Sequence, residues 1–423
     1  MPDINTFFIF TTGCKANQWD SHVIATRLKK GGFAPGTIQN ADFIIVNACS
    51  LTERAETDVR RFIQRSRQLN RGAKVLLVGC HAQAYPGRDF GADLVLGQVE
   101  KFEIDRFLAG KGCFVSGKRD FLMEESPIDG IQKDRTRFFF KIQDGCNKFC
   151  SYCIVPYARG AARSRGIGSI AEAMQALAEK GIKEVVLTGI DVAAYRDPAS
   201  GKGLKDLLVL FDEWKTPPRI RLSSVDPEYI DESFIAVMAG SMKLAKSIHL
   251  PVQSGSDTIL KRMGRRHGSA FVKEVVDRLV RGVGNIGIGM DIMVGFPGED
   301  DASFNDTYEF VRAIDIYYLH VFHYSEREGT RACAMDGKVP ESVKKSRVRL
   351  LKALDAEKRD AFHRRYLGEK VRIIPEGKVR RDGLMKGFTD NYMPVYVPYK
   401  KTLENNLVEV TITDMQDGKL IGG

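Results

Sequence analysis

Short apolar runs alternate with longer polar stretches along the first 115 residues of the chain. Polar stretches with helical periodicity follow the first three runs, at Asn17–Lys30, Thr52–Arg71 and Ala82–Asp89. This alternation predicts an open parallel α/β sheet with right-handed crossovers. The apolar runs are bounded by Gly or Asn, as buried parallel strands are, and comprise Phe7–Thr11, Asp42–Asn47, Lys74–Val78 and Asp93–Leu96.

The same alternation resumes at Phe138 with longer units. Good helix formers such as Ile170–Lys180 and Phe271–Val283 separate the apolar runs. Six βα units over about 190 residues predict a partial parallel (β/α)6 barrel rather than a complete eight-unit barrel. The expected strands are Phe138–Gln143, Glu184–Thr188, Ile220–Ser223, Ser247–Val252, Gly287–Val294 and Tyr317–Tyr324.

The pattern changes again toward the C-terminus. Glu341–Tyr366 has the pattern of a basic amphipathic helix, and the short alternating runs of Leu367–Gly423 predict a small β-barrel. Between the two α/β regions, the stretch 120–137 is polar and has no sustained period. The predicted division is therefore an N-terminal domain over 1–119, a linker over 120–137, a barrel domain over 138–366 and a small β-barrel over 367–423.

Composition narrows the class of protein. The chain has 64 Lys and Arg against 54 Asp and Glu, and this net charge of +10 favours an acidic partner such as RNA or DNA without requiring one. Its 43% hydrophobic content excludes a disordered chain. No apolar run approaches the about 18 residues that cross a bilayer, and the N-terminus lacks the features of a signal peptide. We expect a cytosolic chain with no membrane partner, whose eight cysteines stay reduced.

Three of the cysteines lie close together after the first expected barrel strand. Cys146, Cys150 and Cys153 form a C-x3-C-x2-C loop in DGCNKFCSYCIVPYARG. Three thiolates at this spacing can hold three irons of an iron–sulfur cluster and leave the fourth iron open to a substrate or cofactor. A zinc site is the plainer alternative, but no second Cys or His pair lies nearby. The spacing therefore predicts a cluster.

Three further cysteines each follow an N-terminal apolar run directly. Cys14, Cys49 and Cys80 are separated by 35 and 31 residues, one βα unit each. Because the carboxyl ends of parallel strands meet at one edge of a sheet, we expect these thiols to converge. Three buried core cysteines are the alternative. The regular placement favours a second, auxiliary cluster, and both cysteine sets should face one cavity.

The motifs around both triads resemble the methylthiotransferases of the radical S-adenosylmethionine superfamily. The resemblance covers nearly the whole chain, and the tail with GFTDNYMPVYVP resembles a TRAM domain, an RNA-binding barrel. The matching segments are TTGCKANQWDS, NACSLTERA, GCHAQ, QDGCNKFCSYCIVPYARG, RLSSVDP, HLPVQSGSDTILKRMGRRH, DIMVGFPGE and FHYSEREGTRA.

The resemblance implies a division of labour between two [4Fe-4S] clusters. The cluster of Cys146, Cys150 and Cys153 would cleave S-adenosylmethionine to a 5′-deoxyadenosyl radical, and the cluster of Cys14, Cys49 and Cys80 would carry the sulfur. The chemistry would belong to the clusters, with no side chain as acid or base. An electron donor such as flavodoxin or ferredoxin and a sulfur donor are implied partners.

Five residues are candidates for contacts with S-adenosylmethionine. Each has a structural alternative: a core aromatic for the tyrosine, loop capping for the two strand ends, solvent exposure for the arginine and packing for the aspartate. Gly295 is expected to shape the cofactor floor beside the aspartate. The candidates are Tyr152, Ser223, Gln253, Arg265 and Asp291.

Two basic segments are candidates for a phosphate track. Thr52–Arg71 carries six arginines, and Glu341–Tyr366 carries nine Lys and Arg against four acidic residues. Each is most simply a solvated helix face. Joined to a barrel tail with Tyr392, Tyr396 and Tyr399, they would suit RNA.

The resemblance leaves three substrates open. GCKANQWDS, GCHAQ and the GFTDNY tail are most similar to the group that modifies N6-threonylcarbamoyladenosine at position 37, in the anticodon loop of tRNA. Thr52 stands where the isopentenyladenosine group shows an arginine, and Lys15 stands where the group acting on a ribosomal-protein aspartate usually has proline. We expect methylthiolation of the threonylcarbamoyl form, with the other two as alternatives. A non-catalytic RNA-binding protein and a dithiol redox enzyme are alternatives of other classes.

Overall fold

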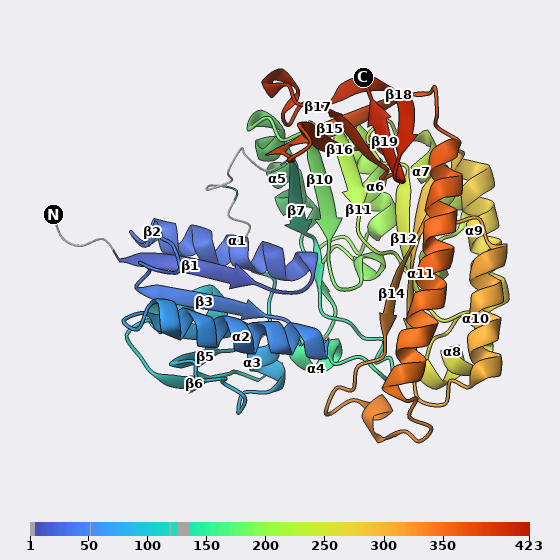
Figure 1. Cartoon of the computed structure of the whole chain (residues 1–423). Helices are drawn as coiled ribbons and strands as arrows, with labels where there is room; N and C mark the ends of the chain where they lie inside the picture. The colour runs from blue at the N-terminus through green and yellow to red at the C-terminus, as the bar shows by residue number, and fades with distance from the viewer. Residues whose placement is uncertain (1–4, 51, 118–120, 125–127, 129–135) are drawn as a thin grey trace.

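The computed structural model describes residues 5–50, 52–117, 121–124, 128 and 136–423. An N-terminal α/β unit, a central β/α barrel and a small C-terminal β-barrel are visible in Figure 1, with the N-terminal unit beside the open side of the central barrel. Within these ranges, no helix combines the length and the apolar composition needed to cross a membrane.

The N-terminal unit is built on a six-stranded sheet in the order β2-β1-β3-β4-β5-β6, and every pair in it is parallel. The expected parallel sheet is confirmed. In Figure 1 the arrowheads of β1 and β3 point toward the central barrel. The strands are β1 (Thr6–Thr11), β2 (Ala34–Pro35), β3 (Phe43–Ala48), β4 (Lys74–Gly79), β5 (Leu94–Leu96) and β6 (Gly112–Phe114).

Alternating strand residues give this sheet two apolar faces. On one face Ile44, Val46 and Val75 pack against Val59 and Ile63 of helix α2 (Glu53–Leu69). The opposite face packs against α1 (Lys15–Lys30) and the 3-10 helix η1 (Glu100–Arg106). Burial of both faces explains why these strands are continuous apolar runs rather than alternating ones.

Two expectations for this unit need correction. The helix expected at Ala82–Asp89 is a single turn, α3 (Cys80–Ala84), because Pro86 disfavours helical geometry at the residue before it. The edge strands β2 and β6 were not expected, since runs of two and three residues are too short to show a pattern.

The central unit has six parallel strands in sequential order around a partial barrel. They form two three-stranded sheets, β7-β10-β11 and β12-β13-β14, joined by isolated parallel bridges from Ile220 to Leu244 and from Ser224 to His249. One apolar core fills the space between strands and helices. The strands are β7 (Arg137–Lys141), β10 (Glu184–Thr188), β11 (Arg219–Leu222), β12 (Ser247–Gln253), β13 (Gly287–Val294) and β14 (Tyr318–His323).

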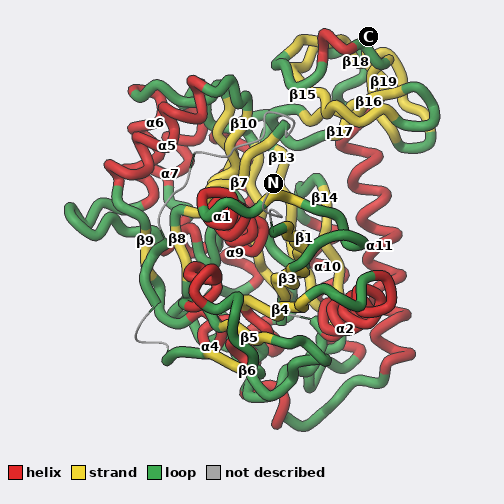
Figure 2. Tube along the Cα trace, turned by 90° about the vertical axis from the view of Figure 1, so that its left-hand side faces the viewer, coloured by secondary structure: helices red, strands yellow, loops and turns green. Residues whose placement is uncertain are grey.

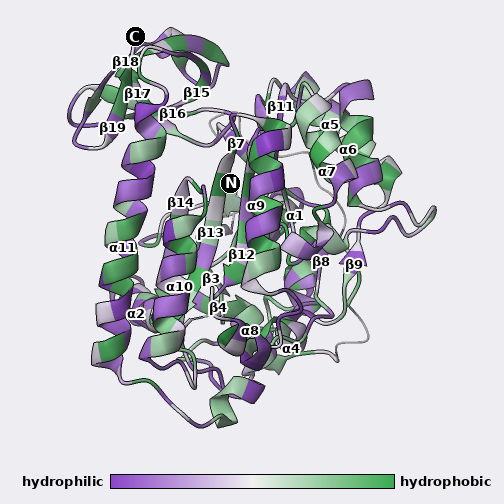
Figure 3. Ribbon diagram, turned by 90° about the vertical axis from the view of Figure 1, so that its right-hand side faces the viewer, coloured by the Kyte–Doolittle hydropathy of each residue, from purple (hydrophilic) through white to green (hydrophobic). Residues whose placement is uncertain are grey.

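Helices cover the outside of this barrel, and their hydrophilic and hydrophobic residues alternate in Figure 3. The long helix α11 (Glu341–Arg364) packs beside β14 and leads to the C-terminal unit. The other helices are α4 (Val155–Arg159), α5 (Ile167–Glu179), α6 (Leu204–Glu213), α7 (Glu232–Gly240), α8 (Asp257–Met263), α9 (Ser269–Val283) and α10 (Asp301–Ala313).

A two-residue hairpin ladder brackets the loop that carries the first cysteine triad. Strand β8 (Gln143–Asp144) pairs antiparallel with β9 (Arg163–Ser164). The residues between them therefore leave and re-enter the barrel at one place, and the cysteine loop is held at both ends.

The C-terminal strands close a small barrel in the order β15-β16-β17-β19-β18. The buried Arg221 anchors it to the central unit by donating to the carbonyls of Thr389 (2.9 Å) and Asp390 (2.8 Å). Figure 2 shows this barrel apart from the N-terminal sheet. Its strands are β15 (Lys370–Val379), β16 (Leu384–Phe388), β17 (Pro394–Pro398), β18 (Val408–Gln416) and β19 (Lys419–Gly422).

The segment expected to be a linker, 120–137, lies largely outside the described residues. Two side chains of its described part pack against the protein, whereas Leu122 is exposed. Phe121 is buried, and the Glu124 carboxylate is buried between Arg165 (3.0 Å) and Lys141 (3.1 Å).

Candidate functional site

The first cysteine triad lies on a tightly constrained loop between β8 and α4. Gly145 begins the loop at φ +71°, where a Cβ would lie 1.9 Å from the Ala161 carbonyl oxygen. The amide of Cys153 donates to the Cys150 carbonyl (3.0 Å), and the amide of Lys148 donates to Cys146 Sγ (3.5 Å). Burial raises the pKa of the Cys153 thiol to about 12. A bound cation would reverse this shift, since metal centres take thiols as thiolates.

The second triad lies where three neighbouring strands of the N-terminal sheet end. Pairing of Thr11 with Asn47 and of Ala48 with Gly79 sets the ends of β1, β3 and β4 level. Cys14, Cys49 and Cys80 follow at these ends.

Packing around this edge places Cys49 and Cys80 close to the segment that carries Cys14. Gly13 has φ +91°, and a Cβ there would lie 2.7 Å from Cys49 Sγ, so the chain passes directly over that thiol. Burial, followed by the neighbouring Cys80, raises the pKa of the Cys14 thiol against the lowering effect of Arg159. The donor set and its convergence fit an iron–sulfur cluster at this edge.

Residues from both units line one cavity of about 520 Å3. All three cysteines of the first triad contribute to its lining, and Cys14 contributes from the second. Cys49 and Cys80 do not line it and are nearly fully buried. The cavity is therefore shared by the two cysteine sets as expected, but Cys14 is the only member of the second set that lines it.

Every expected S-adenosylmethionine contact lines this cavity: Tyr152, Ser223, Gln253, Arg265 and Asp291. Tyr152 also packs edge-on against Phe296. Gln253 ends β12 in the left-handed region at φ +81°, a conformation that non-glycine residues adopt mainly where surrounding contacts impose it.

Arg265 is not exposed to solvent, which was the structural alternative to a binding role. Its Nη2 contacts Asp226 Oδ2 at 2.6 Å and the Pro251 carbonyl at 2.9 Å, and Nη1 lies 3.7 Å from Cys150 Sγ. Asp226 also pairs with Lys148 (2.9 Å). Burial alone would raise the pKa of the Asp226 carboxyl, but His267 and the two cations hold it below its usual range. The arginine is thus fixed beside the first triad.

Gly295 does not shape the cavity as expected. It is absent from the described lining, its amide donates to Glu299 Oε1 (2.7 Å), and Lys344 covers the position of its missing Cβ. Its φ of +71° and this close packing explain the glycine.

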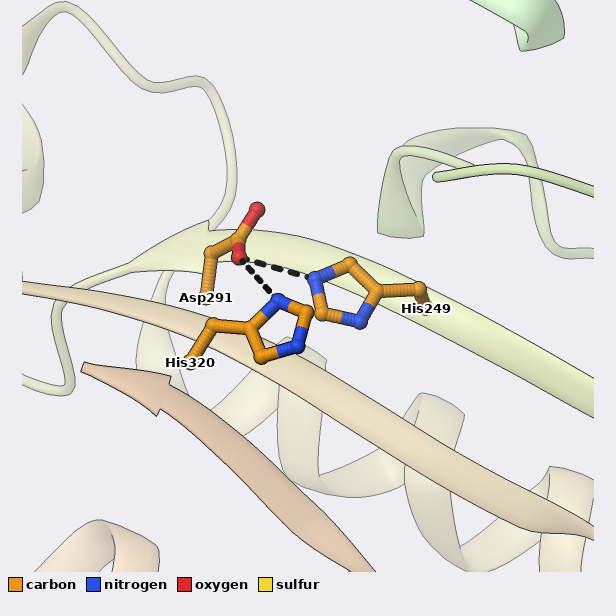
Figure 4. Close-up of side chains that lie close together, drawn as sticks. All are labelled: His249, Asp291 and His320. Atoms are coloured by element: carbon orange, nitrogen blue, oxygen red, sulfur yellow. Dashed lines mark ion pairs between the residues drawn. The ribbon is translucent and has the colours of Figure 1, made fainter. Parts of the chain in front are cut away.

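Two histidines beside Asp291 were missed by the sequence analysis. His249 Nε2 and His320 Nδ1 lie 2.9 Å and 3.4 Å from the same oxygen, Asp291 Oδ1 (Figure 4). His249 Nδ1 also lies 3.2 Å from the Tyr318 hydroxyl. Burial would raise the pKa of Asp291, but both histidines hold it well below its usual range. The three residues lie on the adjacent parallel strands β12, β13 and β14. All three strands were expected from the sequence, and their order along the chain was the signal that could have brought the histidines to notice.

A buried ionic network behind the cavity joins the two α/β units, and it too was missed. Asp20 of α1 contacts Lys141 (2.6 Å), Lys101 (2.7 Å) and Arg159 (2.8 Å), all nearly fully buried. Arg159 also contacts Asp144 (3.0 Å) and donates from Nε to Cys80 Sγ (3.1 Å). One arginine, six residues after Cys153, therefore touches the second triad.

Two family models match the chain: the Radical SAM superfamily over residues 140–311 and the uncharacterized protein family UPF0004 over residues 6–97. The solved structure of the radical S-adenosylmethionine methyltransferase TsrM from Kitasatospora setae is similar with a TM-score of 0.54 and 17% identity, covering 76% of this chain and 75% of that one. At this identity the likeness concerns the fold alone.

Two curated relatives are similar to this chain in sequence over most of their length. The chain is 35% identical to the threonylcarbamoyladenosine tRNA methylthiotransferase MtaB of Thermotoga maritima, over 92% of this chain and 91% of the relative. It is 32% identical to the tRNA-2-methylthio-N(6)-dimethylallyladenosine synthase of Clostridium tetani, over 96% of this chain and 94% of the relative. The chain therefore belongs to the radical S-adenosylmethionine tRNA methylthiotransferases, in the family of the threonylcarbamoyladenosine enzymes.

Proposed function

We propose that this enzyme transfers a methylthio group to C2 of N6-threonylcarbamoyladenosine at position 37 of tRNA. The observation that carries the proposal is the single cavity lined by Cys146, Cys150, Cys153 and Cys14. A radical made at one triad and a sulfur held at the other must reach the same carbon atom, which requires both at one chamber. The family supports the tRNA substrate, and the first relative named above supports the threonylcarbamoyl group.

The cofactors of the family are [4Fe-4S] clusters and S-adenosylmethionine. We assign Cys146, Cys150 and Cys153 to one cluster and Cys14, Cys49 and Cys80 to the other. When bound, the first cluster supplies the electron that cleaves S-adenosylmethionine, and the second supplies the sulfur. Both triads fit this role because each offers three free thiols, one set on a single loop and the other at the ends of three neighbouring strands.

The side chains around the first triad would hold and orient S-adenosylmethionine. Arg265 supplies a fixed positive charge beside Cys150, suited to the methionine carboxylate. Tyr152 offers an aromatic edge for the adenine. Ser223, Gln253 and Asp291 offer hydroxyl, amide and carboxylate groups to the ribose and the amine.

Helix α2 is the basic surface best suited to tRNA phosphates. Arg54, Arg61 and Arg65 are exposed on it and make no hydrogen bond or ion pair within the described part of the chain. Helix α11 is less suited to bind phosphates than expected, because many of its basic side chains form ion pairs with acidic residues of the protein. Its paired cations are Lys344, Arg347, Arg359, Arg364 and Arg365.

The proposal also covers the domain division, the cellular location and the partner proteins. The division into 1–119, 120–137, 138–366 and 367–423 is kept, with the small barrel as a TRAM-like RNA-binding module. Its exposed Tyr399 and neighbouring lysines support that role. A cytoplasmic location, an electron donor such as flavodoxin or ferredoxin, and a sulfur donor follow from the proposed chemistry.

Nucleoside mass spectrometry of tRNA from a deletion strain tests the function. We expect loss of 2-methylthio-N6-threonylcarbamoyladenosine and accumulation of the unthiolated nucleoside, both restored by the gene on a plasmid. An undiminished product would contradict the proposal. Loss of the isopentenyl product would transfer the enzyme to the other tRNA group, and loss of aspartate methylthiolation would transfer it to the ribosomal-protein group.

A further inference from the structure

The cavity has four cationic side chains in its lining: Lys15, Lys148, Arg221 and Arg265. Three of them have acidic partners. Lys148 pairs with Asp191 (3.1 Å) and Asp226 (2.9 Å), and Arg265 pairs with Asp226. Arg221 pairs with Glu184 (2.9 Å) and also holds the C-terminal barrel. Each of these three cations therefore already contacts a carboxylate of the protein.

Lys15 differs from the other three. It is the first residue of α1, directly after Cys14, and its side chain makes no hydrogen bond or ion pair with any residue the structure describes. Burial, followed by the nearby Arg221 and Arg137, lowers the pKa of the Lys15 ammonium. Asp291 and Glu184 oppose this shift without contacting the lysine. Asp291 Oδ1 is shared by two histidines, and Glu184 contacts two arginines. Among the cations of this lining, Lys15 is therefore the one without an acidic contact among the described residues, and an anion bound beside it would favour its charged form.

The wall near this charge is aromatic. Tyr318 lies 5.7 Å from His249 and 6.2 Å from Tyr392 of the C-terminal unit, measured between ring centroids. All three side chains line the cavity with Lys15. An aromatic wall accepts a nucleobase by stacking, and a free ammonium accepts an anion. Together they suit a base that carries a negatively charged substituent.

We propose that the Lys15 ammonium binds the carboxylate of the threonylcarbamoyl substituent and selects for it. This inference rests on the proposed function and names how its substrate is recognised. An isopentenyl group carries no charge. Its binding would exclude water from the ammonium without supplying an anion, and this desolvation would weaken binding. A site built around a charged group discriminates strongly against an analogue that lacks it.

The test uses reconstituted holoenzyme and synthetic anticodon stem-loops that carry either N6-threonylcarbamoyladenosine or its methyl ester. Lys15→Gln removes the charge, Lys15→Arg keeps it, and Lys30→Gln changes an exposed lysine at the far end of the same helix. Dissociation constants from fluorescence anisotropy are measured with product formation, and iron content and the cluster absorption spectrum report on the neighbouring cysteine.

With the carboxylate substrate, we expect Lys15→Gln to weaken binding about 30-fold, the usual scale for removing one partner of a desolvated charge pair. Lys15→Arg should retain most of the affinity, and Lys30→Gln should match wild type. With the methyl ester, wild type should lose its advantage and bind no more tightly than Lys15→Gln, because the ester leaves the ammonium without an anionic partner.

Equal losses for the acid and the ester would overturn the inference, as would loss of iron in Lys15→Gln, since either result assigns the lysine to the cluster. Unchanged binding of the acid by Lys15→Gln would overturn it too. The proposed function fails separately: wild type would then form no methylthio product on the threonylcarbamoyl stem-loop, whatever Lys15 does.

Discussion

At the scale of single residues, the proposed division of roles between the two triads agrees with the position of Arg265, whose guanidinium lies beside Cys150 of the first triad. Cys150→Ala should abolish both cleavage of S-adenosylmethionine and methylthio product. Cys49→Ala should retain reductive cleavage to 5′-deoxyadenosine while losing sulfur transfer. Chromatography of small-molecule and nucleoside products from anaerobic assays measures both.

The exposed Cys113 provides the matched control, and Cys113→Ala should behave as wild type in both assays. A Cys49→Ala enzyme that still forms methylthio product would contradict the sulfur-carrying role of the second triad.

Arg159 follows the first triad closely in the chain and contacts Cys80 of the second. Arg159→Met would leave Asp20 and Asp144 buried with fewer cations, and removing one member of a buried ion pair costs about 3 kcal/mol. We expect a clear fall in the thermal unfolding midpoint and weaker iron retention at the second triad. Arg163→Met, which removes a partly exposed partner of Asp144, should cost much less. Equal effects of the two variants would argue against a special role for Arg159.

At the scale of elements, α2 offers the clearest test of the RNA surface. Replacing Arg54, Arg61 and Arg65 with glutamine removes cations that have no acidic partner among the described residues. Affinity for tRNA should fall, and the slope of log K against log salt should decrease by about two. Salt titrations of tRNA binding measure this slope.

The control for that experiment is Lys352→Gln with Arg349→Gln on α11, where two cations are also exposed. We expect a smaller change there. If the α11 pair reduces the slope more than the α2 set does, the phosphate track follows α11.

The elements also show what a single sequence can predict. The strands that end at Cys14, Cys49 and Cys80 were predictable, because an apolar run followed by a cysteine is a local pattern. The network of Asp20 with Lys141 was not, since 121 positions separate them and each looks like an ordinary surface charge in the sequence. The histidines beside Asp291 lie in two expected strands on either side of it, but the register that brings the three side chains together is given only by the structure.

At the scale of the whole molecule, the buried ionic network holds the N-terminal unit on the barrel. Burial opposes ionisation of Asp20, but Lys101, Lys141 and Arg159 lower its pKa below the usual range, and the pKa of Asp144 is lowered as well. A carboxyl whose folded-state pKa lies below its unfolded value of about 3.9 contributes stability above that pH and loses it as the pH falls further.

Cluster-free protein should therefore lose stability steeply on acidification from about pH 5 to pH 3, followed by thermal unfolding. Asp20→Asn should be less stable than wild type at neutral pH and should lose less over the same range. If Asp20→Asn loses as much as wild type does, the network is not the acid-sensitive element.

The account as a whole depends on two separate clusters at one chamber, and an iron and labile-sulfide analysis of anaerobically reconstituted protein tests this directly. Wild type should bind about eight irons, and alanine at all three positions of either triad should leave about four. A wild-type content of four irons, or complete loss of iron when only the N-terminal triad is replaced, would contradict it.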